Sequence, residues 1–300
     1  MGLQRSVPSM SDIPLRVAND PGRKAGDAGV ASILVYVDFD AECDNRIKIA
    51  ADWAAKFNAA LIGVAGWVPG REAGGRVAAE PERTETRNDR VLAELDKLNG
   101  HFRNIVGERI RTVEWRGSPH LPREVVPAES RSADLVVIGS HPVAEDIYYA
   151  FDPGSVLLNA GRPVLVVPDG VTTNSARRVL VAWKDTREAR HAVQSALPVL
   201  KVAEHVLLVE FAEEVLGRSV QQQLDDVEKY LVRHGIEVNK KSLLSPKGST
   251  ADQLISVAKS EEADLIVAGA YGHSRFGEWV FGGVTRGLLQ KSGICCLFAN

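Results

Sequence analysis

The chain has 300 residues, more than one hydrophobic core usually organises, so its length favours two domains of about 100 to 200 residues each. Apolar residues make up 45% of it and charged residues 25%, which is typical of globular proteins and argues against a disordered or collagen-like chain. The 36 basic and 39 acidic residues give a net charge of −3. We therefore expect no nucleic-acid partner, because binding to a phosphate backbone depends on a basic excess.

The sequence also bears on membranes and redox chemistry. It has no apolar run near the roughly 20 residues that a membrane-spanning helix needs, and it does not begin with a secretory signal. We therefore expect a cytoplasmic protein that does not bind membranes. The three cysteines are odd in number, and Cys295 and Cys296 lie within an apolar run. They and Cys43 are expected to be buried thiols rather than disulfide partners or metal ligands.

The first half of the chain alternates between strand and helix patterns. Residues 33–37 form a β-rich apolar run, and apolar residues at helical spacing follow in 47–54. We expect a strand at 60–64, an amphipathic helix at 91–102 and a further strand at 110–115. Such alternation is typical of a parallel sheet with helical crossovers.

Two segments interrupt this pattern. Residues 69–88 are rich in Gly, Glu and Arg and have no apolar period, so we expect an exposed loop there. The helix pattern at 121–130 contains Pro122 and Pro127, so this helix should be short or irregular. A strand, a helix and a strand then complete the first half.

The second half repeats the first. Residues 133–139, Ala-Asp-Leu-Val-Val-Ile-Gly, recur as Ala-Asp-Leu-Ile-Val-Ala-Gly at 263–269, an offset of 130 residues. The opening strands at 33–37 and 179–183 differ by 146 residues, so the first half carries 16 more residues, which we place in the loop. The further elements of the second half are expected at 189–200, 205–209, 220–231, 236–240 and 250–260.

These patterns predict an α/β fold in which each half is one domain. We expect two tandem Rossmann-like, open, parallel, five-stranded sheets with helices on both faces. The domain boundaries follow from the repeat. A disordered tail is expected at 1–30, the first domain at 31–168, a linker at 169–177 and the second domain at 178–300.

The strand at 265–268 leads into glycines whose spacing suits a phosphate. Gly269 and Gly272 are followed after nine residues by Gly282, and a helix is expected to begin near Gly283. In an open parallel sheet, ligands bind beyond the carboxyl ends of the strands, and a helix N-terminus there favours an anion. The spacing therefore predicts a triphosphate between the two glycine pairs, with a plain turn between strand and helix as the alternative.

The Gly-x2-Gly-x9-Gly pattern after an Asp-Leu-Ile-Val strand resembles the ATP-binding signature of the universal stress protein family. The resemblance covers both halves, from about residue 31 to residue 300. It implies a tandem member that binds ATP or a related adenine nucleotide, with Mg²⁺ as a companion of the nucleotide, in the second domain. The residues it implies as nucleotide-binding are Ala182, Lys184, Gly269, Gly272, His273, Ser274, Gly282, Gly283, Val284 and Thr285.

The second half departs from the family pattern at two positions. Lys184 stands where the family has Asp, and an ammonium does not accept a hydrogen bond from the nucleotide, although it attracts phosphate. Gly283 stands where the family has Ser or Thr, so a hydroxyl is lost but the N–H is kept. His273 and Ser274 follow the second glycine, where solvated loop residues are the alternative to phosphate ligands.

The first half matches the family pattern at the aspartate but departs from it in the loop. Asp38 stands where the family has Asp, but the loop carries Pro142 and Pro153, each of which removes an N–H and fixes the backbone. Asp152 also places a carboxylate where a phosphate belongs, and like charges repel. We therefore expect no ATP in the first domain.

The resemblance implies a stress-response sensor or switch. We expect nucleotide to order residues 272–281 and so to change the surface offered to a protein partner. The loop lacks the Lys-Ser/Thr ending of a Walker motif, and the sequence has no Cys/His metal cluster. We therefore expect no catalytic residues and at most slow ATP hydrolysis.

The resemblance also implies that residues 164–167 pair with 294–298, which would make the two domains an internal pseudo-dimer and cover two sheet edges. Whether two chains associate as a homodimer stays open. Two further functions remain as alternatives. One is an interaction scaffold that binds no nucleotide, and the other is an ATP-dependent enzyme of the adenine-nucleotide α-hydrolase-like group.

Overall fold

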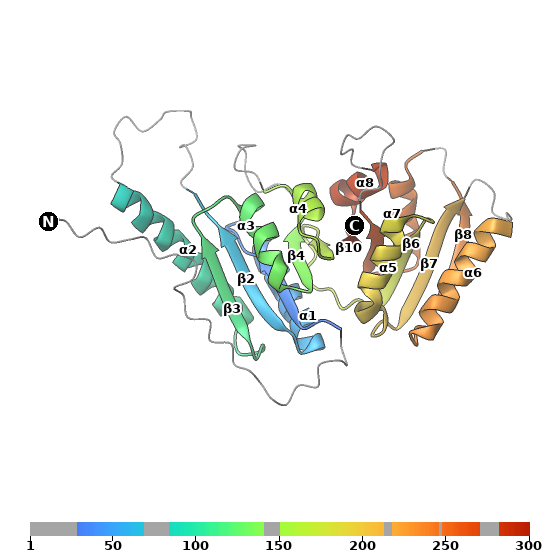
Figure 1. Ribbon diagram of the computed structural model, residues 1–300, viewed down its shortest axis with the longest axis horizontal. Coiled ribbons are helices and arrows are strands. Elements are labelled where there is room, and N and C mark those ends of the chain that lie inside the picture. The colour runs from blue at the N-terminus through green and yellow to red at the C-terminus, as the bar shows by residue number, and fades with distance from the viewer. Residues whose placement is uncertain (1–28, 69–83, 141–150, 213–217, 246–247, 271–281) are drawn as a thin grey trace.

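The computed structural model describes residues 29–68, 84–140, 151–212, 218–245, 248–270 and 282–300 (Figure 1). The described part of the first half forms five strands and four α-helices, and a short 3-10 helix η1 (Ser130–Ser132) follows α3. Its strands are β1 (Ser32–Tyr36), β2 (Ala60–Gly66), β3 (Val113–Ser118), β4 (Leu135–Gly139) and β5 (Val164–Val167). Its helices are α1 (Cys43–Phe57), α2 (Thr84–Val106), α3 (Pro122–Glu129) and α4 (Pro153–Asn159).

The second half repeats this order of strands and helices. Its strands are β6 (Arg178–Trp183), β7 (His205–Ala212), β8 (Asn239–Leu244), β9 (Leu265–Gly269) and β10 (Cys295–Ala299). Its helices are α5 (Arg187–Leu200), α6 (Arg218–Arg233), α7 (Thr250–Ser260) and α8 (Gly283–Lys291).

All ten strands form one sheet in the order β3-β2-β1-β4-β5-β10-β9-β6-β7-β8. Every neighbouring pair is parallel except β5 and β10, which run antiparallel with Leu165 opposite Leu297 and Val166 opposite Cys296. This arrangement confirms the predicted fold class: two open five-stranded parallel sheets joined edge to edge as an internal pseudo-dimer.

The core has two layers, one on each face of the sheet. Residues of α1, α2, α5 and α6 pack on one face, and residues of α3, α4, α7 and α8 pack on the other. Successive strand residues alternate between the layers, as Ile33 and Leu34 do in β1. Both layers run through both halves, so the two domains share one apolar interior.

Two expected strands begin later than the sequence pattern indicated. The strand expected at 110–115 is observed at Val113–Ser118, and the one expected at 236–240 is observed at Asn239–Leu244. Ile110 and Ile236 are buried, but they lie in the turns that lead from helix to strand. The apolar residues that suggested strand therefore belong to the core from positions just before the strands.

The expected short helix and the expected loop of the first half can also be compared with the structure. The helix at Pro122–Glu129 is short, as predicted, with Pro122 in its first turn and Pro127 inside it. The loop expected at 69–88 ends earlier, because α2 begins at Thr84, and residues 69–83 lie outside the described residues. Most of the tail expected at 1–30 also lies outside them.

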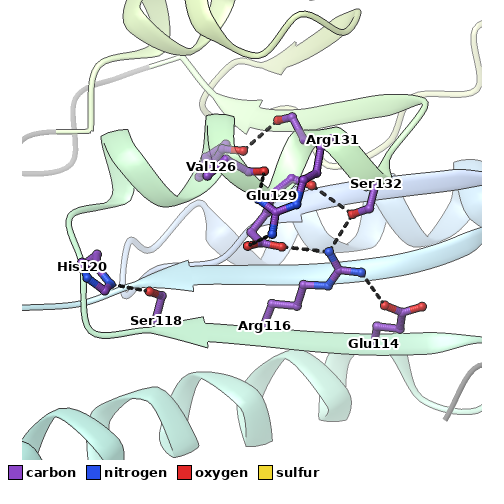
Figure 2. A network of polar contacts seen from close by, with 10 residues as sticks. Glu114, Arg116, Ser118, His120, Val126, Glu129, Arg131 and Ser132 are labelled. Carbon is purple, nitrogen blue, oxygen red and sulfur yellow. Dashed lines mark hydrogen bonds and ion pairs between the residues drawn. The ribbon is translucent and has the colours of Figure 1, made fainter. Parts of the chain in front are cut away.

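A polar network fastens α3 to the outer strand of the first half. Figure 2 shows Arg116 of β3 donating to the carboxylate of Glu129 in α3 and to the Ser132 hydroxyl, at 2.8 and 2.6 Å. Arg116 also pairs with Glu114 at 2.8 Å, and Arg131 donates to Glu129 at 3.1 Å. Glu129 is buried, so its charge depends on these two arginines.

The chain between β5 and β6 packs across α1. Trp53 of α1 donates its indole N–H to the carbonyl of Asn174 at 3.0 Å, and Lys56 donates to the carbonyl of Ser175 at 2.7 Å. The side-chain amide of Asn174 donates in turn to the carbonyl of Asp264, at the start of β9. These contacts tie a helix of the first half to a strand of the second.

We predict that Leu165→Ala lowers the free energy of unfolding by about 2–5 kcal/mol, because Leu165 is fully buried at the β5–β10 junction and its truncation leaves a cavity. Leu92→Ala is the matched control, since Leu92 is 61% exposed and its loss should change stability by no more than about 0.5 kcal/mol. Urea denaturation followed by circular dichroism measures both. Equal losses for the two variants would contradict the role given to the junction.

Candidate functional site

The sheet order reverses direction at two places, and each creates a candidate ligand site. In the first half β1 lies between β2 and β4, and in the second half β6 lies between β7 and β9. Ligands in open α/β sheets bind at the carboxyl ends of the strands where the order reverses. We call the region at the carboxyl ends of β1 and β4 the first cleft, and that at the ends of β6 and β9 the second cleft.

The structure places seven of the ten predicted residues around the second cleft. Ala182 lies in β6 opposite Ala268 of β9, and Lys184 is exposed immediately after β6. Gly269 ends β9, while Gly282 is the N-cap of α8. The other predicted residues of α8 are Gly283, Val284 and Thr285, all in its first turn. The remaining three, Gly272, His273 and Ser274, lie outside the described residues.

Gly269 has a packing reason to be glycine. A Cβ atom on Gly269 would lie 2.7 Å from the carbonyl carbon of Glu188 and 2.8 Å from the backbone nitrogen of Ala189. Both atoms belong to the first turn of α5, which passes directly over the end of β9. Any larger residue would push α5 away, so this glycine shapes the second cleft whether or not it approaches a phosphate.

The N-terminus of α8 has no side-chain cap. Its N-cap, Gly282, has no side chain to accept from the first-turn N–H groups, and those groups have no partner within the helix. Among the described residues, no atom lies within 4 Å of a Cβ placed on Gly282 or Gly283. Unpaired N–H groups and the helix dipole together favour a bound anion.

The equivalent helix of the first half is closed by its own side chain. Asp152 is the N-cap of α4, and its carboxylate accepts from the N–H groups of Gly154 and Ser155 at 3.1 and 3.0 Å. This carboxylate satisfies donors whose counterparts in α8 have no side-chain cap. The first half therefore supplies its own anion at the place where the N-cap of the second half is a glycine.

The first cleft contains a buried ion pair. Asp38, which stands where the family has Asp, accepts from Arg46 Nη2 at 2.8 Å, while Arg46 Nε donates to the carbonyl of Tyr36 at 2.8 Å. The exposed fractions of the Arg46 and Asp38 side chains are 2% and 8%. Burial opposes the charged form of Arg46, yet the pKa of its guanidinium is raised overall because Asp38 stands beside it.

Sequence reasoning missed Arg46, although a signal was present. Arg46, Ala50, Trp53 and Phe57 recur at helical spacing on the buried face of α1. An arginine on an apolar helix face needs an acidic partner nearby, and Asp38 precedes the helix. The pattern could thus have suggested the pair before the structure placed it.

A second group that sequence reasoning missed lies on the α5 and α6 face of the second domain. Trp183, Glu210 and Ser242 stand side by side on β6, β7 and β8, in register at the carboxyl end of the sheet. The indole N–H, one carboxylate oxygen and the hydroxyl of these residues are buried without hydrogen-bond partners. The sequence signal was a lone glutamate within an apolar strand.

The positions of Glu210 and Ser242 are polar in the second half only. In the first half Ala65 and Gly117 face each other on β2 and β3, at the place that Glu210 and Ser242 take in the second. Burial, together with the negative charge of Asp185, raises the pKa of Glu210 above its ordinary value. Ionisation of Glu210 in the folded chain therefore lowers the free energy of unfolding.

The three cysteines are buried and free, as predicted. Burial raises the pKa of the Cys43 thiol to about 11 and that of Cys296 to about 12. No group of three or more potential metal-ligating side chains occurs among the described residues. Among the helices of the described segments, none combines the length and apolar character needed to cross a membrane.

Comparisons with known proteins agree with the fold and with the repeat. The sequence model described as "Universal stress protein family" matches residues 30–168 and 175–298. A universal stress protein from Archaeoglobus fulgidus superposes with a TM-score of 0.71 at 15% identity, covering 90% of this chain and 98% of its own. A comparison with curated protein sequences gave no match.

Two structures from Pseudomonas aeruginosa are also similar. One, titled a putative universal stress protein, has a TM-score of 0.55 at 15% identity and covers 91% of this chain and 94% of its own. The other, titled functionally unknown, has a TM-score of 0.52 at 15% identity and covers 91% and 93%. At this identity the likeness establishes the two-domain fold.

We predict that Glu210→Gln stabilises the protein at neutral pH by roughly 0.5–1.5 kcal/mol, because the variant has no buried charge to desolvate. The folded chain holds the Glu210 proton more tightly than the unfolded chain, so the penalty appears as pH rises through the raised pKa. The advantage of the variant should shrink as pH falls below the ordinary carboxyl pKa. Urea denaturation at a series of pH values measures it.

Glu237→Gln serves as the control for this prediction, since it makes the same substitution at an exposed glutamate, between α6 and β8. Because Glu237 is exposed, its substitution should change the free energy of unfolding by no more than about 0.5 kcal/mol. A Glu210→Gln difference that is flat with pH, or that grows toward acid pH, would refute the burial argument.

Proposed function

The chain belongs to the universal stress protein family, and on this premise we propose that its second domain, residues 178–300, binds ATP or a related adenine nucleotide. In this proposal the protein acts as a stress-response sensor, with at most slow hydrolysis of the nucleotide. The observation that carries the proposal is the difference between the two helix N-termini: α8 has a glycine N-cap and no side-chain cap, whereas the carboxylate of Asp152 caps α4.

The charges around the second cleft support an anionic ligand. The open first turn of α8 presents backbone N–H groups to a phosphate, and Lys184 stands exposed at the end of β6. Within the described residues the Lys184 ammonium has no ion-pair partner, so its charge is available to a phosphate.

The side chains at the strand ends support a ligand in the second cleft as well. Ala182 of β6 corresponds to Tyr36 of β1, whose ring stacks on Phe151 with a centroid distance of 4.2 Å and an interplanar angle of 15°. The aromatic pair fills the first half at this place. Ala182 carries only a methyl group at the place that the Tyr36 ring takes in the first half, so its side chain occupies less space beside β6.

In the proposed role the nucleotide acts through a difference in affinity between two states of the loop that joins β9 to α8. This loop, residues 271–281, lies outside the described residues. Any Mg²⁺ arrives with the phosphates of the nucleotide. A protein partner then distinguishes the loaded chain from the empty one.

The sharpest test copies the closed helix end of the first half into the second. Gly282→Asp places a carboxylate at the N-cap of α8, as Asp152 does in α4, and we predict that ATP affinity falls at least about tenfold because like charges repel. An Asp N-cap is as good as Gly or slightly better for the helix, so the chain should remain folded. Calorimetry with ATP measures the change.

Gly282→Asn is the matched control, because it offers the same cap without the charge. The proposal expects Asn to retain most of the affinity that Asp removes. Equal ATP affinity for wild type and Gly282→Asp would refute the site. No ATP binding by wild type would favour the scaffold function, and release of pyrophosphate from ATP would favour the enzyme of the α-hydrolase-like group.

A further inference from the structure

The guanidinium of Arg46 takes up space at the carboxyl edge of the first domain. Besides its bonds to Asp38 and Tyr36, its Cζ atom lies 5.4 Å from the centroid of the Tyr36 ring. A Cβ on Gly139 would lie 2.5 Å from Arg46 Nη1, so the guanidinium also fills the space beside the end of β4. Arg46 thus spans the first cleft from β1 to β4.

Each residue that forms this arrangement is replaced in the second domain. At the 146-residue offset that relates the opening strands and helices, the counterparts of Tyr36, Asp38 and Arg46 are Ala182, Lys184 and Ala192. Ala192 is buried in α5, so no long side chain from this position reaches the second cleft. The repeat therefore places a buried cation in one cleft and a methyl group in the other.

The carboxylate of Asp38 is incomplete without Arg46. Its Oδ1 atom accepts from Arg46 and from the backbone N–H of Asp40, while Oδ2 is buried with no partner. Removing Arg46 would leave a buried carboxylate with a single backbone donor, which is strongly unfavourable. A guanidinium group presents two parallel N–H donors that match both oxygens of a carboxylate.

We propose that Arg46 is a built-in occupant of the first cleft, so that this cleft is a guanidinium site filled from within the chain. The counterpart of Arg46 in the second domain, Ala192, carries only a methyl group and does not supply such an occupant. This inference concerns residues of the first cleft alone and stands whether or not the second domain binds nucleotide.

The test is chemical rescue of Arg46→Ala in the full chain. The variant should lose roughly 5–10 °C of melting temperature, because a buried carboxylate loses its partner. Methylguanidinium at low millimolar concentration should restore several degrees of this loss and leave wild type unchanged. Methylammonium, which carries the same charge without the planar fork, should restore less.

Two further variants make the outcome decisive. Arg46→Ala combined with Asp38→Asn removes the carboxylate, so methylguanidinium should no longer raise its melting temperature. Arg103→Ala removes an exposed arginine of α2 and should show no response to methylguanidinium.

If Arg46→Ala does not fold alone, the proposal expects folded protein to be recovered when it is refolded with methylguanidinium. A failure to recover it, or an equal response of Arg46→Ala and the variant that lacks Asp38, would overturn the proposal. ATP binding by the second domain is measured separately with Gly282→Asp, so either idea can fail while the other stands.

Discussion

The antiparallel pairing of β5 with β10 is the contact on which the rest of the structure depends. Each half-sheet has one edge strand at this junction, and an unpaired edge is a template for aggregation. The pairing removes both edges at once and makes the two apolar layers continuous through the chain. It also brings α4 and α8 to either side of the junction, as Figure 1 shows. The carboxyl-terminal Asn300 even donates to the carbonyl of Leu157 in α4.

The two domains share this backbone fold, but a few side chains make their clefts different. Tyr36, Arg46 and Asp152 fill the first cleft with an aromatic ring, a buried cation and a helix cap. Their counterparts in the second domain are Ala182, Ala192 and Gly282, all of them small. The backbone fold is the same in both halves, so the difference between them is chemical rather than architectural. In the proposed function, this chemical difference confines nucleotide binding to the second domain.

The fold could be predicted from the sequence because both halves contain long apolar runs in the same order. Apolar strands buried on both faces and helices with one apolar face leave little freedom in the order of elements. The starts of β3 and β8 did not follow, since Ile110 and Ile236 are buried in turns rather than in strands. An apolar sequence pattern alone does not distinguish a residue buried in a strand from one buried in a turn.

The candidate site was less visible in the sequence. The glycines around the second cleft were found from their spacing, but the packing of α5 on Gly269 required the structure. Arg46 and Glu210 were missed because the partner of a buried charge is set by tertiary contact, not by spacing along the chain. Asp38, which matches the family pattern in the first half, is paired with Arg46, and the sequence did not indicate this partner.

The most direct test of the account is the number of ATP molecules that the folded wild-type chain binds, measured by native mass spectrometry across an ATP titration. The account predicts saturation at one ATP per chain, because one cleft is open and the other is filled by Arg46. Saturation at two would contradict the closed first cleft, and no binding would contradict the nucleotide site of the second domain.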